Sequence, residues 1–314
     1  MCMRFSISQR SLLTLLAAAV ALSGCEPTSI TVTEPPALSS DLGAGYRHAT
    51  KIVFGSDRDG NFEIYAIRGD GTEPTRLTNH PAADARATLA PNGKQVAFQS
   101  DRDGNVEIYV MNADGSEVTR LTFHAANDLE PSWSPSGRQI VFSSERDGNS
   151  EIYTMNVDGS GLTRLTDNLV RDDRADWSPD GRKISFVRSL GGNLETFVMN
   201  ADGSDQTNLT NHPAVDVRAD WSPDGKQLAF GSSRDGDVEI FVMDADGSNV
   251  RQLTHNTALD VRASWSPNGK EIAFYSDRDG NLEIYAMFAD GSEQRNLTNN
   301  SGGDLQPDWG SGKL

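Results

Sequence analysis

The amino-acid sequence predicts an all-β protein, a six-bladed β-propeller of four-stranded antiparallel blades. A unit of 44 residues repeats six times in register between residues 52 and 309, with no insertion. Within each unit, apolar residues alternate over short runs, a pattern typical of strands rather than helices. Periods of roughly 40 to 50 residues built from short strands are typical of propeller blades. The repeat is marked by Phe54, Phe98, Phe142, Phe186, Phe230 and Phe274.

Four strands are expected in each unit, in the order in which the chain makes them. The first ends at a tryptophan such as Trp177, and Pro-Asp-Gly at residues 179–181 provides a tight turn into the second strand at 183–186. The third strand, as at 107–111, follows an Asp-Arg-Asp-Gly-Asn turn, and the fourth, as at 119–122, follows a second turn at 112–116. Such a meander has two apolar faces, which only neighbouring blades can bury.

The two ends of the repeat array predict how the ring closes. The first unit opens directly at its second strand, 51–54, whereas the last unit stops after its first strand, 308–310. We therefore expect the C-terminal strand to become the innermost strand of the first blade. Residues 50–314 would then form one domain, and we expect this ring to be monomeric.

The N-terminal residues predict export and a lipid anchor. Arg4 and Arg10 precede an apolar run, 12–22, that is too short to span a bilayer and resembles a secretory signal. The run ends in Leu-Ser-Gly-Cys at residues 22–25, which resembles a bacterial lipobox. We predict a lipoprotein signal peptide at 1–24, a lipid on Cys25 and a flexible tether at 25–49. The alternative is an ordinary secreted protein with an incidental cysteine.

The charge of the chain limits its partners. The formal net charge is −17, and removing Arg4 and Arg10 with the signal leaves 26 basic against 45 acidic side chains, or −19. Nucleic acid and anionic lipid head groups are therefore excluded as partners, and contact with a membrane is expected only through the lipid. A basic peptide, a cationic protein surface or a divalent metal is compatible with this charge.

The repeat resembles that of the TolB family of propellers. The resemblance is carried by Trp-Ser-Pro-Asp-Gly-Lys at residues 221–226 and by Glu-Ile-Tyr-Val-Met-Asn-Ala-Asp-Gly at 107–115, and it extends from about residue 50 to the end. It implies a six-bladed fold and, as in TolB, the binding of an envelope lipoprotein over the central opening. We expect two differences from TolB: no α/β domain ahead of the propeller, and a lipid of the chain's own. Glu26 favours the outer over the inner membrane, with the propeller in the periplasm or at the surface.

Two sets of polar residues are expected at the channel mouth, because the innermost strands line the channel and begin at this face. An aspartate starts each of these strands: Asp84, Asp128, Asp172, Asp216, Asp260 and Asp304. Two residues later stand Arg86, Glu130, Arg174, Arg218, Arg262 and Gln306. We interpret both sets as a polar funnel that binds a protein partner. Alternatively, each aspartate serves the fold by pairing with an arginine of a neighbouring blade.

Metal sites are weaker hypotheses. His80, His124 and His212 occupy equivalent positions that hold asparagine in the other three units, and the Asp-Arg-Asp-Gly-Asn turns carry oxygen atoms at alternate positions. The turn spacing differs from that of an EF-hand, so we expect no cofactor and keep calcium as an alternative. The fourth unit departs, with Arg-Ser-Leu-Gly-Gly-Asn at 188–193.

These observations favour a non-catalytic envelope protein that binds a protein or peptide. The sequence contains no Gly-x-Ser-x-Gly nucleophile motif and no phosphate-binding loop. The alternative is a propeller-type hydrolase acting on carbohydrate or lactone with calcium in the channel. Such an enzyme would need residues that do not repeat, and Glu130, Gln306 and Asp173 are the candidates.

Overall fold

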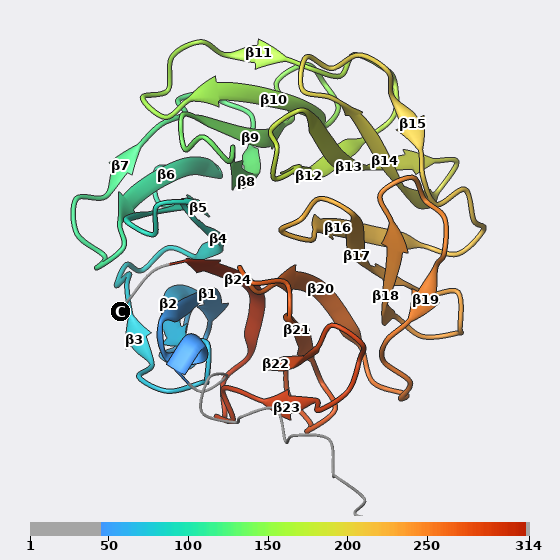
Figure 1. The fold of residues 1–314 in the computed structure, drawn as a ribbon. Coiled ribbons are helices and arrows are strands. Elements are labelled where there is room, and N and C mark those ends of the chain that lie inside the picture. The colour runs from blue at the N-terminus through green and yellow to red at the C-terminus, as the bar shows by residue number, and fades with distance from the viewer. Residues whose placement is uncertain (1–44, 312–314) are drawn as a thin grey trace, which may run out of the picture. The chain divides into compact units, whose positions relative to one another are not determined.

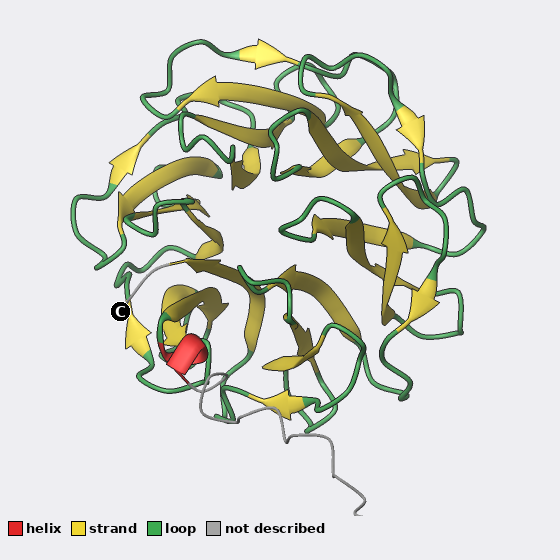
Figure 2. Cartoon of the chain, viewed as in Figure 1, coloured by secondary structure: helices red, strands yellow, loops and turns green. Residues whose placement is uncertain are grey.

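The computed structural model describes residues 45–311, which form a ring of six four-stranded antiparallel sheets. Figure 1 shows the sheets arranged around a central axis, and Figure 2 shows that nearly all regular structure is strand. The predicted six-bladed propeller is thus confirmed. In five of the blades neighbouring strands pair in chain order, so short turns suffice to connect them, and blade 1 combines the last strand of the chain with the first three.

The strands nearest the axis and those second from it make up the inner half of each blade. The innermost are β24 (Asp304–Ser311), β4 (Asp84–Leu89), β8 (Asp128–Trp133), β12 (Asp172–Trp177), β16 (Asp216–Trp221) and β20 (Asp260–Trp265), for blades 1 to 6 in turn. The second strands are β1 (Thr50–Ser56), β5 (Gln95–Ser100), β9 (Gln139–Ser144), β13 (Lys183–Leu190), β17 (Gln227–Ser232) and β21 (Glu271–Ser276).

The outer half of each blade is shorter. The third strands are β2 (Glu63–Arg68), β6 (Glu107–Asn112), β10 (Glu151–Asn156), β14 (Asn193–Asn200), β18 (Glu239–Asp244) and β22 (Glu283–Phe288). The outermost, of two residues each, are β3 (Thr75–Arg76), β7 (Thr119–Arg120), β11 (Thr163–Arg164), β15 (Thr207–Asn208), β19 (Arg251–Gln252) and β23 (Arg295–Asn296). Such short edge strands offer little backbone for pairing with another chain.

The ring closes as predicted. Strand β24 pairs antiparallel with β1, with Trp309 opposite Ile52, so the C-terminal strand is the innermost strand of blade 1 (Figure 1). The Trp309 side chain is buried, and its indole nitrogen donates a hydrogen bond to the Thr50 hydroxyl at 3.0 Å. Residues from the two ends of the described chain therefore complete one sheet.

The hydrophobic core lies between blades rather than within one. Phe98 and Met111 of blade 2, for example, pack with Val53 and Ile64 of blade 1. Neighbouring blades also approach closely at the repeated Asp-Gly turns. Gly115 has a φ of +88°, and a Cβ added to it would lie 2.3 Å from the carbonyl oxygen of Leu77 in the preceding blade. A side chain has no room there, which explains the glycine.

The chain joins the ring slightly before the predicted boundary at residue 50. Residues 45–48 form a helical turn, and Arg47 contacts Glu271 of blade 6 with a Nη2 to Oε1 distance of 2.7 Å. The predicted signal peptide, Cys25 and most of the tether lie outside the described residues. Within the described part of the chain, no helix is long and apolar enough to cross a membrane.

Candidate functional site

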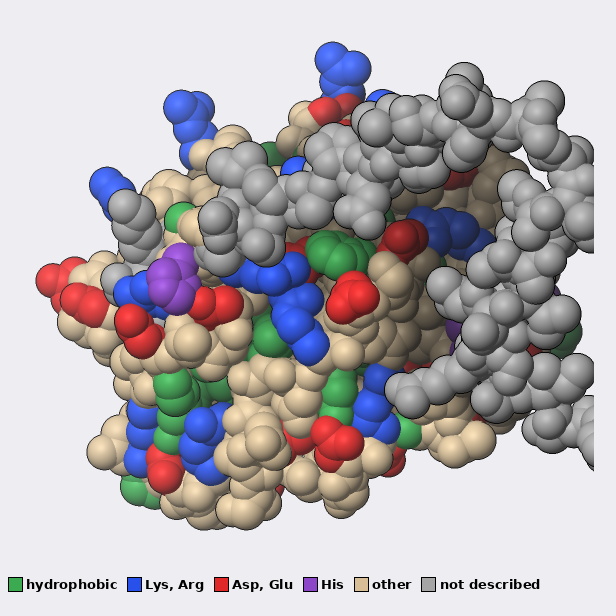
Figure 3. Space-filling model, turned by 60° about the horizontal axis from the view of Figure 1, so that its bottom comes forward, with side chains coloured by type: hydrophobic (Ala, Val, Ile, Leu, Met, Phe, Trp, Pro, Cys, Tyr) green, Lys and Arg blue, Asp and Glu red, His purple; other side chains and the backbone are tan. Residues whose placement is uncertain are grey.

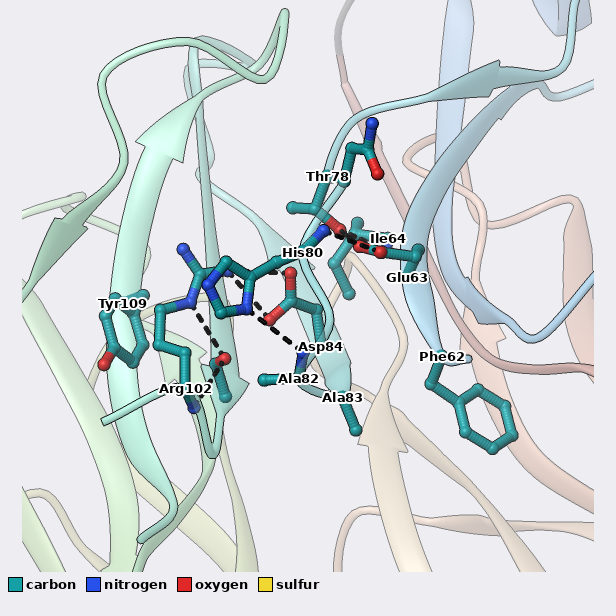
Figure 4. Close-up of polar contacts among 12 residues, drawn as sticks. Phe62, Glu63, Ile64, Thr78, His80, Ala82, Ala83, Asp84, Arg102 and Tyr109 are labelled. Carbon is teal, nitrogen blue, oxygen red and sulfur yellow. Dashed lines mark hydrogen bonds and ion pairs between the residues drawn. The ribbon is translucent and has the colours of Figure 1, made fainter. Parts of the chain in front are cut away.

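The six aspartates at the starts of the innermost strands are fully buried and ion-paired. In blade 2, the Nη2 atom of Arg102 donates hydrogen bonds to both carboxylate oxygens of Asp84, at 2.8 and 2.7 Å (Figure 4). The same guanidinium lies 4.9 Å from the centre of the Tyr109 ring. The equivalent arginines of the other blades, which pair with the other five aspartates, are Arg146, Arg188, Arg234, Arg278 and Arg58.

This arrangement corrects part of the predicted funnel. The aspartate carboxylates offer no exposed surface to a partner, and each pairs with an arginine of its own blade, not of a neighbouring one. Blade 4 keeps the pair despite its different turn. Arg188 lies two positions earlier than its counterparts, opposite Asp172 in the strand register, and its Nε and Nη2 each bond the carboxylate at 2.7 Å.

The residues two positions after the six buried aspartates form a second set, here called the mouth ring: Arg86, Glu130, Arg174, Arg218, Arg262 and Gln306. Each lies in a β-bulge, where two residues of the innermost strand oppose a single residue of the second strand. All six have positive φ, from 29° at Arg218 to 63° at Gln306, although none is glycine. This conformation is strained for a residue with a side chain and is often found at functional sites.

The bulges direct the mouth-ring side chains toward the axis. Arg86 Nη1 lies 3.2 Å from Glu130 Oε1, and Arg174 Nε lies 3.8 Å from the same oxygen. The Gln306 side-chain oxygen accepts a hydrogen bond from the Arg86 backbone N–H at 3.1 Å. Burial disfavours the charged form of Glu130, yet the four arginines outweigh it and lower its pKa. Side chains from all six blades thus meet at one place.

Arg218 and Arg262 are the unusual members of the mouth ring. Only 7% of Arg218 and 5% of Arg262 is exposed, yet within residues 45–311 neither guanidinium has a hydrogen bond or an ion pair. Burial, followed by the charges of Arg218 and Arg86, lowers the pKa of Arg262 well below its ordinary value. Buried arginines are normally paired, because desolvating an unpaired charge is expensive.

Three aspartates further along the innermost strands, Asp176, Asp220 and Asp308, form what we call the floor. Burial raises the pKa of all three, most strongly for Asp220, where the Asp176 charge adds to the effect. They also connect blades: Asp220 accepts the Trp265 N–H and Asp308 the Leu89 N–H, each at 2.8 Å. This backbone bonding gives the floor a structural role.

The residues considered for metal binding have structural bonds instead. The Nδ1 atom of His80 accepts the Ala82 N–H at 3.1 Å, and an asparagine oxygen takes this role where the unit has asparagine, as for Asn300 and Gly302 at 2.8 Å. In the first Asp-Arg-Asp-Gly-Asn turn, Asp59 bonds Tyr65 and Arg76. Among residues 45–311, no group of three or more His, Cys, Asp or Glu side chains is arranged to hold a metal ion.

The face on which the innermost strands begin also exposes apolar side chains. Phe123 and Leu169, in connections from an outermost strand to the next blade, are 75% and 99% exposed. Elsewhere, Figure 3 shows acidic and basic side chains interspersed on the outer wall, with hydrophobic groups only in small separate areas. A hollow of about 540 Å³ lies at the opposite face, between blades 4 and 5, lined by residues that include Pro179, Trp221 and Asp224.

Sequence reasoning singled out the mouth-ring residues as candidates but missed the three floor aspartates. The spacing of the repeat could not show that these residues lie in bulges with positive φ, or that Arg218 and Arg262 lack partners within residues 45–311. The floor aspartates precede Trp177, Trp221 and Trp309 directly, where the other units have threonine or serine. That variation at one repeat position was the available signal.

Two family models match parts of the chain. The TolB β-propeller domain matches residues 174–238 and 219–313, and the N-terminal β-propeller domain of tricorn protease matches residues 47–151. A search of curated proteins found no match.

Solved structures with a similar fold include proteins titled as TolB and as oligogalacturonate lyase. TolB from Acinetobacter baumannii is 24% identical over 84% of this chain and 67% of its own, with a TM-score of 0.76. A protein assigned as TolB in Agrobacterium tumefaciens is 22% identical over 81% of this chain and 90% of its own, with a TM-score of 0.68. Oligogalacturonate lyase from Vibrio parahaemolyticus is 14% identical over 80% of this chain and 75% of its own, with a TM-score of 0.56. At these identities the likeness concerns the fold.

Proposed function

Because this chain is a TolB-like six-bladed β-propeller, we propose that it is a non-catalytic binding protein of the bacterial cell envelope. Its partner is a protein or peptide that docks on the face where the innermost strands begin, over the mouth ring. The observation that carries this proposal is the mouth ring itself. Six non-glycine side chains, each on a strained bulge, converge on the axis from six blades.

The differences among the blades support recognition of an asymmetric partner. All six blades have the bulge, but the residue in it is arginine in four blades, Glu130 in blade 3 and Gln306 in blade 1. Repetition of the backbone serves the fold, whereas variation of the side chain at a constant backbone position creates a distinct chemical surface. The buried aspartate pairs hold the strand ends that carry this surface.

Apolar groups on the same face support a protein partner rather than a small ligand alone. Phe123 and Leu169 are large and highly exposed, and they flank blade 3 on this face. Aromatic side chains and arginines are enriched in protein interfaces, and this face exposes both Phe123 and the mouth of the channel. The polar groups that recur in every blade already bond within the fold, which supports a binding role over catalysis.

Reversing the charge of Arg174, Arg218 and Arg262 by substitution with glutamate should abolish partner capture. Repulsion at a desolvated contact costs several kcal/mol, so we expect at least a tenfold loss. The measurement is affinity capture: the tagged full-length chain is incubated with envelope proteins, and each protein that it retains is identified. A partner should be retained by the natural chain and lost by the triple variant.

The control carries the same change of charge on the opposite face. Arg138, Arg182 and Lys226 lie in the turns after β8, β12 and β16 and are exposed. Substituting these three with glutamate should leave capture unchanged. Equal capture by the mouth-ring variant and this control would refute the proposed docking face, and turnover of a carbohydrate or lactone by the purified chain would refute the non-catalytic role.

The lipid on Cys25 is a separate part of the proposal, supported by the lipobox-like sequence at residues 22–25. A Cys25→Ala variant cannot accept a thioether-linked lipid, so we expect it to move from the membrane fraction to the soluble fraction of the envelope. The measurement is fractionation of cells with immunodetection, with a Ser23→Ala variant as control. An unchanged membrane fraction for Cys25→Ala would exclude this anchor.

A further inference from the structure

Two arginines of the mouth ring have no counter-ion within the described residues. Arg262 Nε and Nη1 are buried without a hydrogen-bond partner, and the Arg218 side chain makes neither a hydrogen bond nor an ion pair with residues 45–311. A guanidinium presents five N–H donors, and at Arg262 Nε and Nη1 burial removes the water that would otherwise accept them. The fold therefore holds donors at the axis that require an acceptor from outside.

The charges around these arginines leave a local positive excess. Around the mouth, five guanidinium groups, those of the four mouth-ring arginines and of Arg171, lie near the two carboxylates of Glu130 and Asp173, so positive charges outnumber negative ones. Arg86 and Arg174 are the members that contact Glu130, and Arg171 also pairs with Asp173. Arg218 and Arg262 are thus the two that remain without a paired carboxylate.

The floor does not supply the missing acceptor. All three floor aspartates lie within electrostatic range of Arg218, and Asp308 also lies within range of Arg262. None of the three floor aspartates hydrogen-bonds either arginine in the part of the chain described here. Their oxygens bond Ser132 and the backbone N–H groups of Leu89 and Trp265 instead, and burial favours their neutral form.

We propose that the mouth ring is an oxyanion-binding site in which Arg218 and Arg262 bind a carboxylate or phosphate group entering along the channel axis. The planar fork of a guanidinium matches both groups through paired N–H donors. A bound oxyanion would satisfy the unpartnered Arg262 nitrogens and balance the excess charge. This inference extends the proposed function: it concerns a small anionic group and does not require a protein partner.

The test measures the thermal stability of the purified full-length chain in sodium citrate and in sodium phosphate, against sodium chloride at equal ionic strength. We expect one or both oxyanions to raise Tm above the chloride value, because a ligand that binds the folded state stabilises it. Citrate alone would identify carboxylate as the group, and phosphate alone would identify phosphate. Arg262→Gln, which places here the residue found at Gln306, should weaken binding about tenfold or more by titration calorimetry.

The Tm of Arg262→Gln in chloride and a control variant separate binding from changes in folding. Arg262→Gln should raise Tm in chloride alone, because it removes a buried charge that has no partner. Arg182→Gln removes an exposed arginine on the opposite face and should change neither Tm in chloride nor the response to oxyanions.

Several results would overturn the inference. These are equal Tm values in citrate, phosphate and chloride, an equal oxyanion response in Arg262→Gln, or stabilisation by calcium chloride without any by the sodium salts, which would indicate a cation site instead. The test is independent of partner capture. An oxyanion response without any captured protein would refute docking alone, whereas capture that depends on the mouth ring without an oxyanion response would refute only this site.

Discussion

Deleting residues 304–314 should abolish cooperative folding of the propeller. The deletion removes β24, and with it the innermost strand of blade 1, the pairing with β1 and the buried Trp309 side chain. Loss of a buried tryptophan alone costs roughly 3–5 kcal/mol, so the total loss exceeds about 5 kcal/mol, which is comparable to the stability of many domains. The measurement is thermal unfolding followed by circular dichroism, where the sharp transition should disappear.

A circular permutant provides the control for this deletion. Residues 304–309 are placed ahead of residue 51 and joined to it through a copy of the turn 222–226, and the new chain ends at residue 303. Because Trp309 lies opposite Ile52, as Trp221 lies opposite Leu228, the joined strands form the hairpin present in the other blades. The permutant should unfold cooperatively near the natural Tm. A cooperative transition in the deletion variant would show that ring closure contributes little.

Replacing Arg146 with methionine should destabilise the chain by about 3–5 kcal/mol, the usual effect of leaving a buried charge without its partner. Arg146 Nη2 donates to both oxygens of Asp128, at 3.0 and 2.9 Å, and Asp128 has no exposed surface. The free energy of unfolding from urea titration measures the loss.

A double variant distinguishes the ion pair from the packing of the arginine, whose guanidinium lies 4.9 Å from the Tyr153 ring centre. Adding Asp128→Asn to Arg146→Met removes the unpaired charge and should restore part of the stability. Arg182→Met, at an exposed position, should change stability by less than about 0.5 kcal/mol. If the double variant is no more stable than Arg146→Met, the stacking contact rather than the charge explains the loss.

The net charge of the chain and the charge of its channel mouth point to different partners. With a formal charge of −17, the chain as a whole should attract cationic molecules, as we expected from composition. The mouth ring has four arginines against one glutamate, so the group that enters the channel should be anionic. A partner that combines a cationic surface with an acidic loop would satisfy both.

The sequence by itself determined the number of blades, the order of strands in each blade and the closure of the ring by residues 304–311. These properties follow from a period of 44 residues and from local signals, namely alternating apolar residues and Pro-Asp-Gly turns, which act over a few positions. It also gave Arg86, Glu130 and their counterparts equivalent positions in the six units, and equivalent positions in a ring must lie at equal depth.

Only the tertiary structure decided which of these polar groups are available to a partner. Asp128 and Arg218 read alike in the sequence as charged residues at the mouth, yet one is paired within its blade and the other has no partner in residues 45–311. The difference depends on a bulge with positive φ, which arginine does not favour locally, and on contacts among blades distant in sequence. Pairing and desolvation are properties of atoms brought together in space, and a repeat pattern does not contain them.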